Sequence, residues 1–415
     1  ITEQLVMDTF GCWLYNDENI LTKPSLLAKW IPREKSIKFG WQTKYLAMSY
    51  FKEWCNNRKN SNLARKKCCT HYRKLIANLN KKLKTPQINQ CNGTWKDINF
   101  NENVTGITLS RQKRAFMNIT KDNQWREFKY DRDECRKNYE KYINDCRVGN
   151  KKIKGSRVGI IEIIKEALNC KVNDNKILEN NLNLQWEAGG KNLKNLKNLK
   201  NLVAIVDTSE SMNSEGGIPL YAGIGLGLRI AENSRLGKRI MTFSESPQWI
   251  NLEDKSSLVD MAKTLQKNNN WGAGTNFEAT MQLICNACIE KDLDNTVVKD
   301  LVLIIFSDMQ IEQADTNAPY LHLFVKKMFA NAGLQSSHKV PYEVPHIIYW
   351  NLRSTRGFPS LSTEQNVSML SGFSPILLNS FCEKGKNALE DCTPWKLLVR
   401  QLKNERYSWI WNIVK

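Results

Sequence analysis

The chain has 415 residues, which suits two domains of roughly 150–250 residues each. Hydrophobic residues make up 41% and aromatic residues 9%, and this supply of core-forming side chains excludes a wholly disordered protein. No run of about 18 apolar residues occurs, so the sequence predicts no membrane-spanning helix.

The positive charge is confined to the first half of the chain. Residues 1–200 hold 40 Lys and Arg against 20 Asp and Glu, a net charge of +20. Residues 201–415 hold 21 against 22, a net charge of −1. This asymmetry indicates a polyanion-binding half joined to a neutral half. The alternative is an AT-rich coding bias toward Lys, Asn and Ile, which would not by itself leave the second half neutral.

The twelve cysteines are too sparse for a disulfide scaffold, so we expect reduced, buried thiols and a reducing, cytoplasmic compartment. Cys285 and Cys288 form a lone CxxC within a helical pattern. With no second pair and four histidines in the chain, we expect no structural zinc site. The sequence begins with Ile1, and its first residues do not have the basic-then-apolar pattern of a signal peptide. We therefore expect an internal or processed start.

Amphipathic patterns over residues 62–84, 131–146 and 158–168 predict an all-α, helical-repeat (HEAT-like) domain over residues 1–188, without a fixed period. Its basic side chains, with His71 and Tyr72 nearby for base stacking, are candidates for nucleic-acid binding. The alternative is a set of solvated cations. The candidates on the first stretch are Arg65, Lys66, Lys67, Arg73, Lys74, Lys81 and Lys82, and those expected in a loop are Arg111, Lys113 and Arg114.

Residues 189–201 repeat the triplet Lys-Asn-Leu, which predicts an exposed linker and a domain boundary. From residue 202 to residue 415, strand and helix patterns alternate as in a doubly wound, mostly parallel α/β domain. The expected strands are 202–207, 239–250 (a strand or hairpin), 301–306, 344–350 and 376–379. The expected helices are 221–233, 260–266, 277–289, 320–332 and 395–406.

Oxygen-bearing side chains follow two of these strands, where doubly wound folds place their ligand sites. The sequence Asp-Thr-Ser-Glu-Ser follows the first strand, Ser-Asp-Met follows a later one, and a glycine-rich turn lies between them. This combination resembles the metal-ion-dependent adhesion site of von Willebrand factor A domains. The resemblance implies a Mg²⁺ site (or one for another divalent cation) formed by Asp207, Ser209, Ser211, Thr275 and Asp308.

Such a donor set is rich in hydroxyls and short of negative charge, so an acidic partner can complete the coordination of the cation. Glu210 departs from the family pattern, which often has Gly at that position. The alternative is that these oxygens only cap helices and turns. No positioned general base, G-x-S-x-G elbow, Walker loop or HExxH motif occurs, and we therefore expect no enzymatic activity.

Further segments resemble an uncharacterised, Ro-like (TROVE-like) family of large DNA viruses, plants and fungi. They are residues 27–35, 243–247, 306–310, 349–358 and 371–375. In Ro proteins a ring of helical repeats is closed by a von Willebrand A domain and binds structured RNAs and single-stranded RNA ends. Relatives usually carry helices before residue 27, so the resemblance implies that the helical domain is incomplete at its N-terminus.

The sequence thus favours a cytoplasmic, non-catalytic protein that binds RNA or a ribonucleoprotein, with a Mg²⁺-dependent site for an acidic ligand. The alternative is a structural or assembly protein, a virion component if viral, that uses the metal site for protein–protein contact. Added salt and charge reversal of the basic residues should weaken RNA binding. A chelator or the substitution Asp207→Ala should abolish a metal-dependent protein contact.

Overall fold

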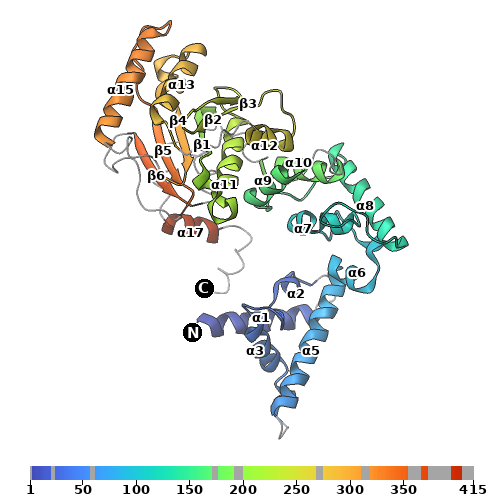
Figure 1. Ribbon diagram of the computed structural model, residues 1–415. Helices are drawn as coiled ribbons and strands as arrows, with labels where there is room; N and C mark the ends of the chain where they lie inside the picture. Colours follow the sequence, from blue (N-terminus) through green and yellow to red (C-terminus); the bar gives the residue numbers. More distant parts are fainter. Residues whose placement is uncertain are drawn as a thin grey trace. The chain divides into compact units, whose positions relative to one another are not determined.

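Helices form the first part of the chain, and a six-stranded sheet organises the second. The computed structural model describes residues 2–19, 24–56, 61–170, 176–190, 200–267, 274–309, 318–353, 366–372 and 394–403 (Figure 1). They belong to two compact units, Ile1–Lys152 and Ile153–Lys415. No helix within these ranges combines the length and hydrophobicity that crossing a membrane requires.

The first unit is built around α5, whose buried side chains follow a helical period. Cys68, Tyr72, Ile76 and Leu79 are at most 2% exposed and pack with Leu46 and Ala47 of α3 in one cluster. The helices of this unit are α1 (Thr2–Asn19), α2 (Leu27–Trp30), α3 (Gly40–Tyr50), α4 (Glu53–Asn56), α5 (Ser61–Lys82), α6 (Pro86–Asn92), α7 (Gly106–Phe116) and α8 (Tyr130–Arg147).

Aromatic side chains hold α7 and α8 together. The ring of Phe100 lies 5.0 Å from that of Phe116 and 5.3 Å from that of Tyr139, measured between centroids. Phe116 on α7 and Tyr139 on α8 are fully buried. Such edge-to-face and tilted ring contacts contribute to holding the two helices together.

The sheet of the second unit has the order β3-β2-β1-β4-β5-β6, so the chain starts in the middle and extends first to one edge and then to the other. All neighbours are parallel except β2 and β3, which form an antiparallel pair at one edge. The strands are β1 (Leu202–Asp207), β2 (Arg239–Phe243), β3 (Trp249–Asn251), β4 (Val302–Ser307), β5 (His346–Asn351) and β6 (Val367–Ser371).

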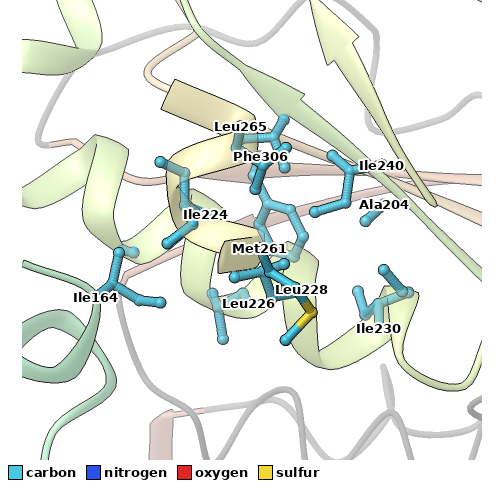
Figure 2. Packing of buried hydrophobic residues seen from close by; sticks show 14 of the residues in the cluster. Ile164, Ala204, Ile224, Leu226, Leu228, Ile230, Ile240, Met261, Leu265 and Phe306 are labelled. Atoms are coloured by element: carbon cyan, nitrogen blue, oxygen red, sulfur yellow. The ribbon is translucent and has the colours of Figure 1, made fainter. Parts of the chain in front are cut away.

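Helices cover both faces of this sheet because the central strands are apolar on both sides. Ala204 and Phe306 face one layer, which contains α9 (Ile160–Asn169), α11 (Ser214–Ala231) and α12 (Leu258–Lys267). Ile205 and Ile305 face the other, which contains α13 (Phe277–Glu290) and α15 (Ala318–Gln335). Figure 2 shows part of the first layer, where Phe306 of β4 lies among residues of α11 and α12. The remaining helices of the unit are α10 (Lys176–Gly190), α14 (Asn295–Asp300) and α17 (Pro394–Leu402).

Helices α9 and α10, which the sequence analysis assigned to the first domain, pack in the second unit. Ile163 and Ile164 of α9 belong to the same buried cluster as the strands. The Arg229 guanidinium of α11 lies 3.3 Å from the ring centroid of Trp186 on α10, and the Trp186 indole donates to Glu232 Oε1 at 2.7 Å. Most of the predicted linker, residues 191–199, lies outside the described residues.

The predicted fold class is confirmed at the level of a helical first part and a mostly parallel sheet in the second. The strands at 202–207, 301–306 and 344–350 match β1, β4 and β5 to within two residues, and 239–250 is the antiparallel pair β2–β3. Strand β6 at 367–371 was not predicted, and the strand expected at Ile376–Asn379 lies outside the described residues.

Close packing of α11 on the sheet leads to a stability prediction. A Cβ added at Gly227 would lie 2.7 Å from Cγ2 of buried Val206, whereas one at Gly223 would lie 3.3 Å from its nearest neighbour. We expect Gly227→Ala to lower the free energy of unfolding by about 1–3 kcal/mol, because overpacking outweighs the helix propensity of alanine. Gly223→Ala on the same helix is the matched control with a smaller effect. Urea denaturation measures both, and equal effects would contradict the packing argument.

Candidate functional site

Two aspartates lie at the carboxyl ends of neighbouring parallel strands. Val206 of β1 pairs with Phe306 of β4, so the residues that follow, Asp207 and Asp308, emerge at the same edge of the sheet. Asp207 is 1% exposed and Asp308 is fully buried. This edge is where doubly wound folds bind their ligands. The fold therefore brings together the two carboxylates that the sequence analysis selected.

Neighbouring groups hold the Asp207 carboxylate in place. Its Oδ1 accepts a hydrogen bond from the backbone N–H of Ser209 at 2.9 Å, and its Oδ2 accepts one from the Ser307 hydroxyl at 2.5 Å. Burial raises the pKa of Asp207 to about 6, and the charge of nearby Asp308 acts in the same direction, against the hydrogen bonds from Ser307 and Ser209. The carboxylate is thus desolvated without full compensation, a situation that a bound cation would relieve.

Two of the predicted hydroxyl ligands, Ser209 and Ser211, follow Asp207 closely in the chain. The third, Thr275, lies just before α13. The hydroxyls of Ser209 and Ser211 are 2.9 Å apart. The Thr275 hydroxyl oxygen is buried and has no hydrogen-bond partner among the described residues. The next residue, Asn276, donates its backbone N–H to the carbonyl oxygen of Ser244, directly after β2, at 3.0 Å.

This donor set fits a hard divalent cation. Carboxylate and hydroxyl oxygens are the ligands that Mg²⁺ prefers, and an unpartnered buried hydroxyl such as that of Thr275 is costly unless a ligand satisfies it. Within the described part of the chain, no group of three or more His, Cys, Asp and Glu side chains is placed to hold a metal ion. A cation at this edge would therefore depend on the serine and threonine hydroxyls.

An arginine that the sequence analysis did not select reaches the same edge. The Arg353 guanidinium, which follows β5, has its Nη1 3.3 Å from Asp308 Oδ2. The backbone N–H of Arg353 donates to Asn351 Oδ1 at 2.8 Å, which fixes the turn after the strand. Glu210, the departure from the family pattern, is exposed at the start of a short 3-10 helix. The positive charge beside the Asp308 carboxylate is thus the guanidinium of Arg353.

The thiols of the CxxC motif are part of the hydrophobic core. Cys285 and Cys288 lie on α13 and are fully buried. Burial raises the pKa of Cys288 to about 12 and that of Cys285 further. Protonated thiols in this environment behave as small apolar side chains.

The basic residues predicted on the first amphipathic stretch lie on α5, mostly opposite its buried face. Seven of its residues are Lys or Arg, and none is Asp or Glu. The exposed ones are Arg65, Lys66, Arg73, Lys74, Lys81 and Lys82, and Lys67 is half-buried. We call these seven side chains the α5 basic face.

Ion pairs distinguish α5 from α8 of the same unit. On α8, Arg136 bridges Asp133 and Glu140 at 2.8 Å each, and Lys137 contacts Asp133 and Glu134. Such pairs at three- and four-residue spacing neutralise a helix surface. On the α5 basic face, Arg73 has an ion pair with Glu34 at 3.4 Å, from outside the helix.

The proposed stacking residues near α5 are engaged within the unit. Tyr72 is 1% exposed, and its hydroxyl donates to the Pro32 carbonyl oxygen at 3.1 Å, so it cannot stack on a base. The His71 ring stacks on Trp54 with centroids 4.6 Å apart. The selection of Tyr72 was wrong because the helical period places it on the inner side of α5.

The second basic cluster lies on a helix and not in a loop. Residues 106–116 form α7, whose first turn is capped by the Thr105 hydroxyl accepting from the backbone N–H of Thr108 at 3.3 Å. Arg111 is exposed and Arg114 is half-buried, whereas Lys113 is 2% exposed. Lys113 was therefore a wrong choice for phosphate contact, because its side chain points inward.

The comparisons with known proteins find a domain family and solved structures to which the chain is similar. Residues 201–406, slightly less than half of the chain, are similar to a family described as "Domain of unknown function (DUF7788)". Among solved structures, the chain is similar to the Ro (RSR) protein of Deinococcus radiodurans with 12% identity and a TM-score of 0.36, covering 90% of this chain and 76% of that one. At this level the likeness assigns neither fold nor function. No curated protein matches the chain.

Proposed function

We propose that this protein is a cytoplasmic, non-catalytic RNA-binding protein that contacts RNA through the α5 basic face. The observation that carries the proposal is a 22-residue helix with seven basic residues and no acidic one. The phosphates of RNA are the abundant partner for such a surface, and contact with them releases condensed counterions. In this proposal the helical part is HEAT-like and binds RNA, and the part with the parallel sheet is von Willebrand A-like and carries a second site.

Filter binding tests this function with the full chain. The probe is a structured RNA with a single-stranded tail, beside a duplex DNA of equal length, over a titration of salt. We expect binding that favours the tailed RNA and falls steeply with salt. Equal and weak binding to both probes would mean that the net charge of +20 in the first half serves only solubility.

We further propose that Asp207, Ser209, Ser211, Thr275 and Asp308 hold Mg²⁺, in the manner of a metal-ion-dependent adhesion site. The cation would supply a coordination position for an acidic group of a protein or ribonucleoprotein partner. The buried, unpartnered hydroxyl of Thr275 and the desolvated carboxylate of Asp207 support this assignment. The chain's own residues would orient the ligands, since Ser307 and the backbone of Ser209 fix the Asp207 carboxylate.

The contact of Arg353 with Asp308 predicts a variant that binds cations more tightly. Arg353 Nη1 lies 3.3 Å from Asp308 Oδ2 and reduces the negative potential of the site. We expect Arg353→Gln to lower the dissociation constant for Mg²⁺ roughly tenfold, the effect of removing one partly screened positive charge from a buried carboxylate. Isothermal titration calorimetry measures it, and weaker Mg²⁺ binding by the variant would contradict a counter-ion role for Arg353.

A further inference from the structure

A groove of about 630 Å³ lies within the first unit, between the α2 segment and helices α5, α6 and α7. Its size is within the range of pockets that hold small ligands or a nucleotide. Lys29, Trp30 and Arg33 line one side, and Gln87, Arg111 and Gln112 line the other. None of the described residues that line the groove is Asp or Glu.

Hydrogen bonds fix the α2 side of the groove against α5. The Asn80 amide donates to the carbonyl oxygens of Ala28 at 2.9 Å and Ile76 at 2.8 Å. Arg33 Nη2 donates to the same Ala28 carbonyl oxygen at 3.0 Å. On the opposite side, the Gln90 amide donates to Gln112 Oε1 at 2.6 Å and joins α6 to α7. The walls are therefore preorganised, which lowers the entropic cost of binding a ligand.

Trp30 presents its indole ring to solvent at this groove. Its side chain is 68% exposed, although the residues before it, Leu27 and Ala28, are buried and anchor the turn. The Lys29 ammonium lies 5.8 Å from the centroid of the indole ring. A large exposed aromatic surface beside a groove is typical of a binding site, because a flat ligand can cover it.

We propose that this groove binds an unpaired nucleotide of RNA, with the base stacked on Trp30 and the flanking phosphates held by Lys29, Arg33 and Arg111. The proposal rests on the RNA-binding function proposed above and names the single-stranded segment that the protein takes. A base offers a planar face for the indole, and the flanking phosphates offer negative charge to Lys29, Arg33 and Arg111. An acidic peptide would satisfy the cations but would leave the indole uncovered.

The experiment measures fluorescence anisotropy of the full chain with two probes, a labelled octauridylate and a labelled blunt-ended RNA duplex without unpaired nucleotides. Trp30→Ala should weaken binding of the octauridylate roughly tenfold, the loss expected for one base–aromatic stack. Trp30→Phe should keep most of the affinity. The duplex, which offers no unpaired base, should bind all variants alike. Trp41→Ala is the matched control, since Trp41 lies on α3 outside the groove and is 52% exposed.

The outcomes separate this inference from the proposed function. Unchanged octauridylate binding by Trp30→Ala, or an equal loss for the duplex, overturns the groove assignment and leaves RNA binding by the α5 basic face intact. Competition by octaglutamate as strong as that by unlabelled octauridylate also overturns it, because it would show a general anion site. If the wild-type chain binds neither of the two RNA probes, the proposed function itself is overturned. Thermal melting of each variant verifies that exposed Trp30 is not needed for folding.

Discussion

Reversing Lys66, Lys74 and Lys81 to glutamate is expected to weaken RNA binding about 100-fold at about 0.1 M salt, if each lost phosphate contact is worth about 1 kcal/mol. All three side chains are exposed on α5, at positions away from its buried residues. The triple variant should also flatten the dependence of the logarithm of affinity on the logarithm of salt concentration, by roughly one in slope for each contact removed. Filter binding over a salt titration measures both quantities.

A control with the same change in net charge distinguishes a local surface from the overall charge of the unit. Lys121, Lys141 and Lys152 are exposed in the first unit and lie outside α5. Reversing these three to glutamate should reduce RNA affinity by less than tenfold, since only long-range attraction changes. Equal losses in the two triple variants would contradict a defined α5 interface and indicate non-specific attraction. Circular dichroism on both variants verifies that the helices are retained.

The central sheet was predictable from the sequence because short, β-branched apolar runs are typical of central parallel strands. The runs LVAIVD and LVLIIF became β1 and β4, which are buried at every position. Strand β6 has the sequence VSMLS and lies at the edge of the sheet, where its first four residues are half-buried and Ser371 is exposed. The two serines interrupt the apolar residues, so the segment is neither an apolar run nor a strict alternation. The strand therefore forms because it pairs with β5, and the local sequence pattern does not predict it.

Helix α7 shows where local reasoning about the basic half was wrong. Its sequence GITLSRQKRAF contains two β-branched residues and few strong apolar ones, so it resembled a loop. The helix is stabilised by the Thr105 cap and by burial of Leu109 and Phe116 against neighbouring elements. Phe116 packs on the rings of Phe100 and Tyr139, which are distant in sequence, and Lys113 on the same helix is buried. Leu109, Lys113 and Phe116 are spaced by four and three residues, so the helical period places Lys113 on the buried face, and the expectation of a loop concealed this.

The candidate metal site was partly predictable for a topological reason. Residues that follow parallel strands must meet at one edge of the sheet, so Asp207 and Asp308 could be paired before their geometry was known. Arg353 could not be assigned, because its contact with Asp308 depends on where the turn after β5 directs a long side chain. Trp30 was not selected as a candidate from the sequence either. Its turn is anchored by Asn80, while its ring is exposed.

Loss of Mg²⁺-dependent stability in Asp207→Asn is the expected result that best tests the proposed metal site. If wild-type protein binds Mg²⁺, a concentration of about 100 times the dissociation constant should stabilise the fold by about 2.7 kcal/mol. For a unit of this size, that corresponds to a rise in melting temperature of roughly 5–10 °C. Asparagine keeps the size of Asp207 and one acceptor oxygen for its hydrogen-bonding neighbours, but it removes the charge that a cation requires.

Differential scanning calorimetry with Mg²⁺ and with a chelator measures this effect, and the exposed carboxylate of Asp300 supplies the control. Asp300→Asn should respond to Mg²⁺ as the wild type does. Asp207→Asn should melt at the same temperature with and without Mg²⁺, since the desolvated site no longer favours a cation. A full Mg²⁺ response in Asp207→Asn would locate the cation elsewhere. RNA affinity that falls in this variant together with the Mg²⁺ response would mean that the two proposed activities depend on one site.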